Sequence, residues 1–203
     1  GCQMNKSDSE SIAGAFQIKG YRSAKSVNDA DVVIINTCSV RQSAEDRVVG
    51  QVNNLIKIKS SSKKLKIILT GCMLRYGEKR LKKMLPGVDE FVKFKDLIKD
   101  AKPLYNAPAS ALEASHRLIQ PRSPRDASAG KWVKIMEGCD NYCTYCVVPY
   151  ARGREVSRPM EEIVCEVEEL VKRGIKHITL LGQNVNSYGN NFAKLLVILN
   201  DIK

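Results

Sequence analysis

Three cysteines share one short segment of the chain, Cys139, Cys143 and Cys146, in the spacing Cys-x-x-x-Cys-x-x-Cys. Thiolates are preferred ligands of iron–sulfur clusters and of zinc, so three of them on one loop can converge on a single metal centre. The loop supplies no fourth ligand, which leaves one position of such a centre open. An open iron can bind a small molecule, so the spacing favours chemistry at a cluster over electron storage. A structural zinc site with a distant fourth ligand is the alternative.

Three more cysteines, Cys2, Cys38 and Cys72, stand beside predicted secondary structure. Cys38 directly follows an apolar run at residues 32–36, Cys72 follows another at residues 67–70, and Cys2 precedes the first predicted helix. The carboxyl ends of parallel strands meet at one edge of a sheet, where ligands bind. The placement therefore predicts a second three-thiolate site, with burial of the cysteines in the core as the alternative.

The elements that must position these cysteines alternate between strand and helix. Residues 31–36 and 65–70 are continuous apolar runs rich in β-branched side chains, which is typical of parallel strands covered on both faces. Helices are predicted to follow at residues 42–58 and 78–84. The first helix is predicted to begin at a capping box formed by Ser7 and Glu10, and to end near Lys19.

A second strand–helix–strand unit surrounds the first cysteine loop. Residues 132–137 read as a strand that leads into the loop, residues 161–173 as a helix ended by Gly174, and residues 176–182 as the next strand. Between the two regions, four prolines and fading periodicity predict a linker with a short helix at residues 109–118. The predicted divisions are a first domain at residues 1–102, a linker at 103–130 and a second domain at 131–203.

Composition narrows the class of protein. The chain has 203 residues, of which 43% are hydrophobic and 27% are charged, and these values are typical of soluble globular domains. No apolar run reaches the roughly 20 residues of a membrane span, so we expect no membrane association. Seven cysteines, an odd number, fit metal binding in the reducing cytoplasm, or in an organelle if the source is eukaryotic. The net charge of +11 favours a polyanionic partner such as RNA.

The cysteine loop and its continuation at residues 147–159 resemble the cluster loop of radical S-adenosylmethionine (SAM) enzymes, and within them the MiaB-type tRNA methylthiotransferases. Gly1-Cys2-Gln3-Met4-Asn5 and the segments at residues 36–41 and 70–73 match the three cysteine motifs of that family's N-terminal domain. The resemblance covers residues 1–96 and 131–203. It implies an α/β protein, with an open parallel-sheet, Rossmann-like domain followed by the first part of a partial TIM-like barrel.

The same resemblance implies two 4Fe-4S clusters and SAM as cofactors. The cluster on Cys139, Cys143 and Cys146 would give an electron to SAM, and the resulting 5′-deoxyadenosyl radical would abstract hydrogen. The cluster on the second cysteine group would carry the sulfur that is methylated and transferred. The residues matched to SAM contacts are Tyr145, Gly182, Gln183 and Asn184. Family members often carry Gly-Gly-Glu where this chain has Gly182, Gln183 and Asn184, so the acid is absent here. A simple turn is the alternative for these three residues, and packing in the core is the alternative for Tyr145.

The implied activity is insertion of a methylthio group at carbon 2 of N6-isopentenyladenosine next to the anticodon. The expected partners are the tRNA anticodon stem-loop, an external reductant and a sulfur source, with the protein as a monomer. Sister enzymes that act on threonylcarbamoyl-adenosine tRNA or on a ribosomal protein are the alternative. A non-catalytic iron–sulfur or zinc RNA-binding protein is more remote. The family pattern also leads us to expect a strand before Cys2, and further barrel strands and an RNA-binding domain after Lys203.

Four other residues near these motifs have weaker interpretations. Arg152, Arg154 and Arg158 border the cysteine loop and could bind a substrate phosphate or the SAM carboxylate, or simply be solvated. Cys165 falls on the polar side of its predicted helix, without a neighbouring thiol, and is interpreted as a cysteine outside any cluster.

Overall fold

A computed structural model describes residues 1–61, 65–99, 130–189 and 191–202. The chain forms two compact units, Gly1–Ala101 and Lys102–Lys203, and each is described by itself. The predicted linker helix at residues 109–118 lies outside the described residues, as does the rest of the linker up to residue 129.

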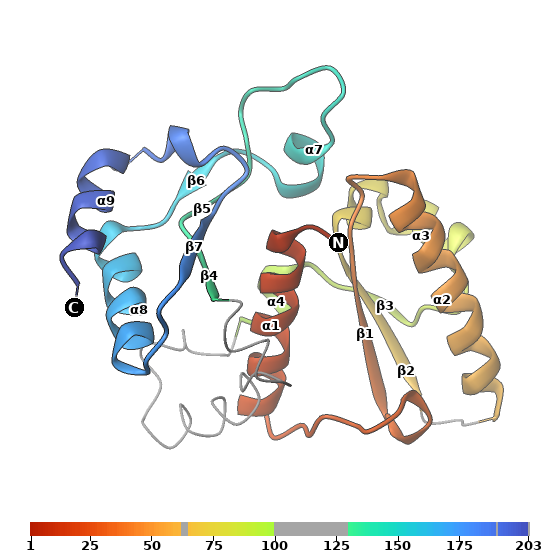
Figure 1. The fold of residues 1–203 in the computed structure, drawn as a ribbon. Coiled ribbons are helices and arrows are strands. Elements are labelled where there is room, and N and C mark those ends of the chain that lie inside the picture. Colours follow the sequence, from red (N-terminus) through yellow and green to blue (C-terminus); the bar gives the residue numbers. More distant parts are fainter. Residues whose placement is uncertain (62–64, 100–129, 190, 203) are drawn as a thin grey trace. The chain divides into compact units, whose positions relative to one another are not determined.

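The first unit is built on a parallel sheet in the order β1-β2-β3, with helices on its two faces (Figure 1). The strands are β1 (Val32–Thr37), β2 (Lys66–Gly71) and β3 (Glu90–Phe91). The helices are α1 (Gln3–Ile18), α2 (Gln42–Ser61), α3 (Glu78–Met84) and α4 (Phe94–Leu97), with 3-10 turns η1 (Val27–Asp29) and η2 (Cys72–Tyr76). The predicted fold class of this unit is confirmed.

Alternate side chains of β2 explain why the middle of its sequence, residues 67–69, is an unbroken apolar run. Ile67 and Leu69 join a buried cluster with residues of α2 and α3, whereas Ile68 packs on the other face with Ile12 of α1 and Leu97 of α4. Successive side chains of a strand point to opposite faces, so where helices cover both sides of a sheet, consecutive positions of the strand are apolar.

The predicted start of the first helix is wrong. Helix α1 begins at Gln3 with Cys2 as its N-cap, and the Cys2 Sγ accepts a hydrogen bond from the Asn5 amide at 3.4 Å. Ser7 is a buried residue inside the helix and does not cap it. Cysteine is not among the usual N-cap residues, so the capping rules pointed to the next Ser–Glu pair.

The second unit contains a βαβ motif and a short antiparallel pair (Figure 1). Strands β4 (Lys131–Lys134) and β7 (Ile178–Leu181) are parallel and are joined through helix α8 (Met160–Lys172). Strands β5 (Met136–Glu137) and β6 (Val156–Ser157) are antiparallel. The remaining elements are α7 (Val148–Arg152), η4 (Val185–Ser187) and α9 (Phe192–Asn200).

The single strand predicted at residues 132–137 is divided at Ile135. The Ile135 amide donates to the Leu181 carbonyl at 2.9 Å, while its carbonyl accepts from the Arg158 amide at 2.8 Å. Ile135 is therefore where the chain changes its partner from β7 to β6. This change delivers the cysteine loop, at residues 138–155, between two paired strand ends.

Candidate functional site

Two of the three cysteines of the first unit follow adjacent strands at paired positions. Thr37, the last residue of β1, is the register partner of Gly71, the last residue of β2. Cys38 and Cys72 come directly after this pair. Because neighbouring parallel strands lie about 4.8 Å apart, the backbones of the two cysteines leave the sheet side by side.

Gly71 allows the two strand ends to approach closely. It has a φ of +90°, and a Cβ at this position would lie 2.4 Å from the Thr37 carbonyl oxygen. The Thr37 hydroxyl donates to the Thr70 carbonyl at 2.6 Å and accepts from the Met73 amide at 3.0 Å. The backbone on both sides of Cys72 is thus fixed to the end of β1.

Asn5 connects the third cysteine to the same edge of the sheet. Its side-chain amide donates to the Asn36 and Thr37 carbonyls at 3.2 and 3.1 Å, while its backbone amide donates to the Cys2 Sγ. The Asn36 side chain returns a hydrogen bond of 2.9 Å to the Asn5 carbonyl. Asn5 therefore holds the N-terminal end of α1, with Cys2 at its cap, against the end of β1.

The thiols of this group are suitable donors, although they do not form a finished metal site. Cys38 and Cys72 are buried, Cys2 is half-buried, and none of the seven cysteines is in a disulfide. Within the described part of the chain, no three His, Cys, Asp or Glu side chains are arranged to hold a metal ion. What fits a cluster is the donor set: three soft thiol ligands on three segments that Asn5 and Thr37 tie together. The assignment of this cluster stays a prediction.

The second cysteine group lies on a loop whose two ends are joined. Strand β5 enters the loop and β6 leaves it, with Glu137 paired to Val156. Gly138 has a φ of +82°, and a Cβ there would lie 2.1 Å from the Arg154 carbonyl oxygen. The Cys139 amide donates to the Gly153 carbonyl at 3.3 Å. A side chain at residue 138 would force the two ends of the loop apart.

Inside this loop the three thiols differ in exposure. Cys139 is buried, Cys146 is half-buried and Cys143 is exposed, and the Cys146 amide donates to the Cys143 carbonyl at 2.9 Å. The Asp140 carboxylate accepts from the Arg154 Nε at 2.9 Å and from the Glu155 amide at 3.1 Å. The loop is thus shaped by its own backbone and by Asp140, with its middle thiol facing solvent. The assignment of a cluster here also stays a prediction.

The segment after β7 contacts both ends of the cysteine loop. At the start of the loop, the Gln183 Oε1 accepts from the Gly138 amide at 2.7 Å. At its end, the Ser187 hydroxyl donates to the Glu155 carboxylate at 2.7 Å, and the Gly189 amide donates to the Ser157 hydroxyl at 2.9 Å. Sequence patterns did not indicate Ser187, Glu155 or Ser157, because these hydrogen bonds join residues about thirty positions apart.

The four residues predicted to contact SAM have different surroundings. Tyr145 is 90% exposed, so its ring is free of the core. A Cβ on Gly182 would lie 2.5 Å from Met136, so this glycine allows the segment to pack on β5. The Gln183 oxygen is bonded to Gly138, and the Asn184 carbonyl accepts from Ser187 at 2.8 Å. Gln183 therefore positions the cysteine loop in this structure, and all four SAM contacts stay predictions.

All three arginines at the loop pair with carboxylates of the same unit. The Arg158 Nη1 donates to the Lys134 carbonyl at 2.6 Å and pairs with Glu166 at 2.7 Å. The Arg152 side chain is 8% exposed and pairs with Glu137 at 3.2 Å. The Arg154 side chain is exposed and forms an ion pair with Asp140 at 2.9 Å. The Cys165 side chain is exposed on α8, as its sequence position predicts.

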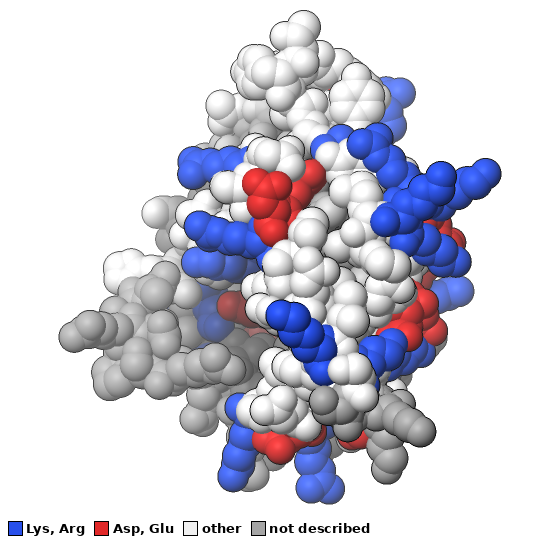
Figure 2. All heavy atoms as spheres, turned by 90° about the vertical axis from the view of Figure 1, so that its right-hand side faces the viewer, with Lys and Arg blue, Asp and Glu red and all other residues white. Residues whose placement is uncertain are grey.

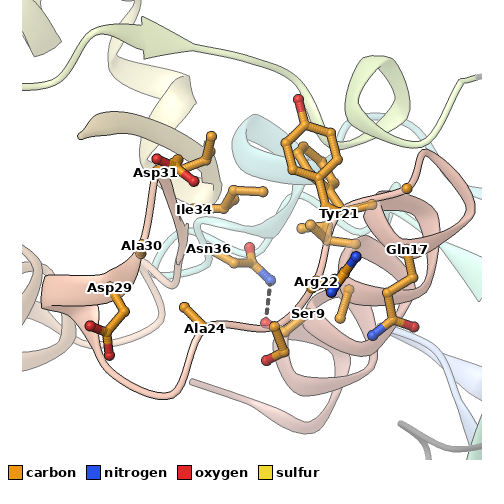
Figure 3. A pocket seen from close by; sticks show the side chains of 16 residues that line it. Ser9, Gln17, Tyr21, Arg22, Ala24, Asp29, Ala30, Asp31, Ile34 and Asn36 are labelled. Carbon is orange, nitrogen blue, oxygen red and sulfur yellow. Dashed lines mark hydrogen bonds between the residues drawn. The ribbon is translucent and has the colours of Figure 1, made fainter. Parts of the chain in front are cut away.

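A cavity of about 720 Å³ lies on the α1 side of β1 (Figure 3). Ser9 and Gln17 from α1, Tyr21 and Arg22 from the following loop, and Asn36 from β1 contribute to its lining. Figure 3 shows the hydrogen bond from the Asn36 side chain to the Ser9 hydroxyl, which is 3.0 Å long. No cysteine lines this cavity, so it is separate from the thiols. Asn36 lines the cavity and is also hydrogen-bonded to Asn5, which holds the first cysteine group.

Comparison with known proteins assigns a family to each region of the chain. Residues 1–93 match an uncharacterized protein family, UPF0004, and residues 133–202 match the radical SAM superfamily. The first region contains Cys2, Cys38 and Cys72, and the second contains Cys139, Cys143 and Cys146.

Three curated relatives of the chain carry the same name. The chain is 41% identical, over its whole length, to a tRNA-2-methylthio-N(6)-dimethylallyladenosine synthase of Thermoanaerobacter sp. (strain X514). It is 40% identical to proteins of the same name from Dictyoglomus thermophilum, over 96% of the chain, and Dehalococcoides mccartyi, over all of it. In each case it spans 46% of the relative, so the chain covers about half the length of the proteins it matches.

Replacing Asn5 tests the arrangement of the first cysteine group. Asn5→Ala removes the donors to the Asn36 and Thr37 carbonyls, so Cys2 is no longer held beside Cys38. We expect anaerobic reconstitution to yield about four irons per chain where the parent protein takes up about eight. The free energy of unfolding should fall by about 1–3 kcal/mol, because buried acceptors lose their partners. The exposed Asn53→Ala is the matched control. Full iron content in Asn5→Ala would contradict this role.

Replacing Gln183 tests what holds the cysteine loop. Gln183→Leu leaves the buried Gly138 amide without its acceptor, which should cost about 1–3 kcal/mol of stability. Gln183→Glu keeps an oxygen at the same place and should remain close to the parent protein. Unfolding by urea can be followed by the fluorescence of Trp132, the single tryptophan, which lies in β4 of this unit. Equal losses in both variants would show that the hydrogen bond does not hold the loop.

Proposed function

Because the chain belongs to the radical SAM methylthiotransferase family, with a UPF0004 region followed by a radical SAM region, we propose that the protein inserts a methylthio group at carbon 2 of N6-isopentenyladenosine next to the anticodon of tRNA. The relatives' names give the same modified nucleoside as N(6)-dimethylallyladenosine. The single observation that carries the proposal is the presence of two separate three-cysteine groups, one in each family region.

The two groups are supported by unlike scaffolds, which suits two different tasks. Cys38 and Cys72 are buried at paired strand ends and Cys2 caps a helix, so a cluster held there would be partly enclosed by the protein. Cys143 is exposed at the tip of a loop, so a cluster held there would be open to a small molecule. When bound, the two 4Fe-4S clusters and SAM supply the electron, the radical chemistry, the sulfur and the methyl group.

In this proposal, residues of the chain position the cysteines that would hold the two clusters. Asn5, Thr37 and Gly71 bring the segments of the first cysteine group together. Gln183 and Asp140 fix the two ends of the second loop. The Asn5 amide also donates a hydrogen bond to the Cys2 sulfur, and hydrogen bonds to ligand sulfurs are one of the means by which proteins set cluster potentials.

The proposal includes partners that follow from this chemistry. A tRNA anticodon stem-loop is the substrate, and the net charge of +11 favours attraction of its phosphates. An external reductant must supply electrons, and an external source must replace the sulfur that leaves with each product. The protein acts as a monomer in the cytoplasm. No helix in the described part of the chain is long and apolar enough to cross a membrane.

The test is a product assay with the protein at its natural full length. The anaerobically reconstituted protein is incubated with SAM, a reductant and tRNA that carries N6-isopentenyladenosine, and the nucleosides are analysed by mass spectrometry. We expect deoxyadenosine and the 2-methylthio nucleoside. Cys143→Ala should abolish both products, whereas Cys165→Ala, at an exposed cysteine outside both groups, should leave them unchanged.

The choice of tRNA separates the related activities. Product on threonylcarbamoyl-adenosine tRNA, and none on isopentenylated tRNA, would assign the protein to the sister branch. Absence of methylthio product on either tRNA, from protein that contains both clusters and cleaves SAM, would contradict the proposal.

A further inference from the structure

Two arginines of the first unit are packed on one tyrosine ring. The guanidinium carbons of Arg75 and Arg80 lie 4.0 and 4.6 Å from the ring centroid of Tyr76. Both distances are well within the range of about 6 Å in which a cation is attracted to an aromatic face. Arg75 and Tyr76 belong to η2 and Arg80 to α3, so the ring joins two elements.

A buried carboxylate fixes this group to the protein. Glu45 of α2 is only 4% exposed, and its two oxygens accept from the Tyr76 hydroxyl at 2.9 Å and from the Arg75 Nη2 at 3.3 Å. Burial, the hydrogen bond to Glu45 and its charge raise the pKa of Tyr76, so the hydroxyl stays protonated and remains a donor. The ring, and the arginines on it, are thus held in place before any ligand binds.

This group stands next to the first cysteine site. Element η2 begins at Cys72, and Arg75 is three residues later. Side chains three residues apart lie on the same side of a 3-10 helix, about 6 Å apart along its axis. Arg75 therefore lies on the same side of η2 as Cys72, one turn further along.

Part of the charge of this group is not neutralised. Glu45 accepts from the Nη2 of Arg75. The Nε and Nη1 of Arg75 have no acceptor among the described residues. Arg80 has no carboxylate partner in the same part of the chain. Its neighbours on α3 add to the charge, because Lys79 and Lys83 also lack a described carboxylate partner, while Lys82 pairs with Glu78 at 2.6 Å.

The surrounding surface has the same sign. Figure 2 shows the side of the first unit that carries α2 and α3, and Lys and Arg cover more of it than Asp and Glu. A guanidinium presents several donors in a plane and suits the oxygens of a phosphate. A nucleotide brought to the Cys72 site would bring its backbone phosphates with it, and arginines fixed at this place would be available to bind them.

We propose that Arg80, together with Arg75 on the ring of Tyr76, binds a backbone phosphate of the RNA whose base is presented to the cysteine group at Cys72. This inference rests on the proposed function, since it names where that substrate is held. Arg80 is a binding residue and takes no part in the chemistry. The contact positions the RNA and carries no base specificity.

The test measures RNA affinity directly. Arg80→Gln and Arg80→Glu are made in the reconstituted full-length protein, with Lys95→Gln as the control. Lys95 is an exposed cation on α4, which packs on the opposite face of the sheet. The dissociation constant for a fluorescent anticodon stem-loop is measured by anisotropy at several salt concentrations, and iron content and SAM cleavage without RNA are measured in parallel.

We expect Arg80→Gln to weaken binding about tenfold at low salt, and to reduce the slope of log affinity against log salt by about 0.7–1. Arg80→Glu should weaken it further, with iron content and SAM cleavage unchanged in both. Affinity and slope equal to those of Lys95→Gln would overturn the inference, while methylthio product from the parent protein would leave the proposed function standing. A loss of affinity in Arg80→Gln, with no methylthio product from the parent protein, would support the phosphate site and contradict the proposed function.

Discussion

The parallel register between β1 and β2 is the constraint on which the first cysteine group depends. It places Thr37 opposite Gly71, and the two residues that follow are Cys38 and Cys72. The apolar faces of β2 hold this register, because Ile67 and Leu69 pack toward α2 and α3 while Ile68 packs toward α1 and α4. A shift by one residue would reverse every side chain of the strand and separate the two cysteines. Packing in the core therefore determines where Cys38 and Cys72 lie relative to each other.

The second cysteine group is held in a different manner. Its loop leaves the βαβ motif at Ile135, where the chain changes its hydrogen-bonding partner, and the segment after β7 then contacts both ends of the loop. The start of the loop is buried at Gly138, whereas its middle is exposed at Cys143. The first cysteine group is enclosed at a sheet edge and the second is open on a loop. This difference agrees with the proposal that the first carries sulfur and the second binds SAM.

Much of this arrangement could be predicted from local sequence. The runs at residues 31–36 and 65–70 indicated parallel strands, because a strand covered on both faces has apolar residues at consecutive positions. The same reasoning placed Cys38 and Cys72 at one edge. It missed the start of α1, since a thiol is an unusual helix cap, and the division of the strand at Ile135, since a change of strand partner depends on Leu181 and Arg158. The contacts of Asn5, Gln183 and Tyr76 were also missed, because they join distant residues or depend on side-chain packing that leaves no periodic signal.

The measurement that tests the two-site account most directly is a count of iron and acid-labile sulfide, combined with Mössbauer spectroscopy, on two triple variants. In one, Cys2, Cys38 and Cys72 are replaced by alanine; in the other, Cys139, Cys143 and Cys146 are replaced. The account predicts about eight irons in the parent protein and about four in each variant, all in cubane clusters. A variant that keeps the full iron content of the parent, or a parent protein that binds only zinc, would contradict it.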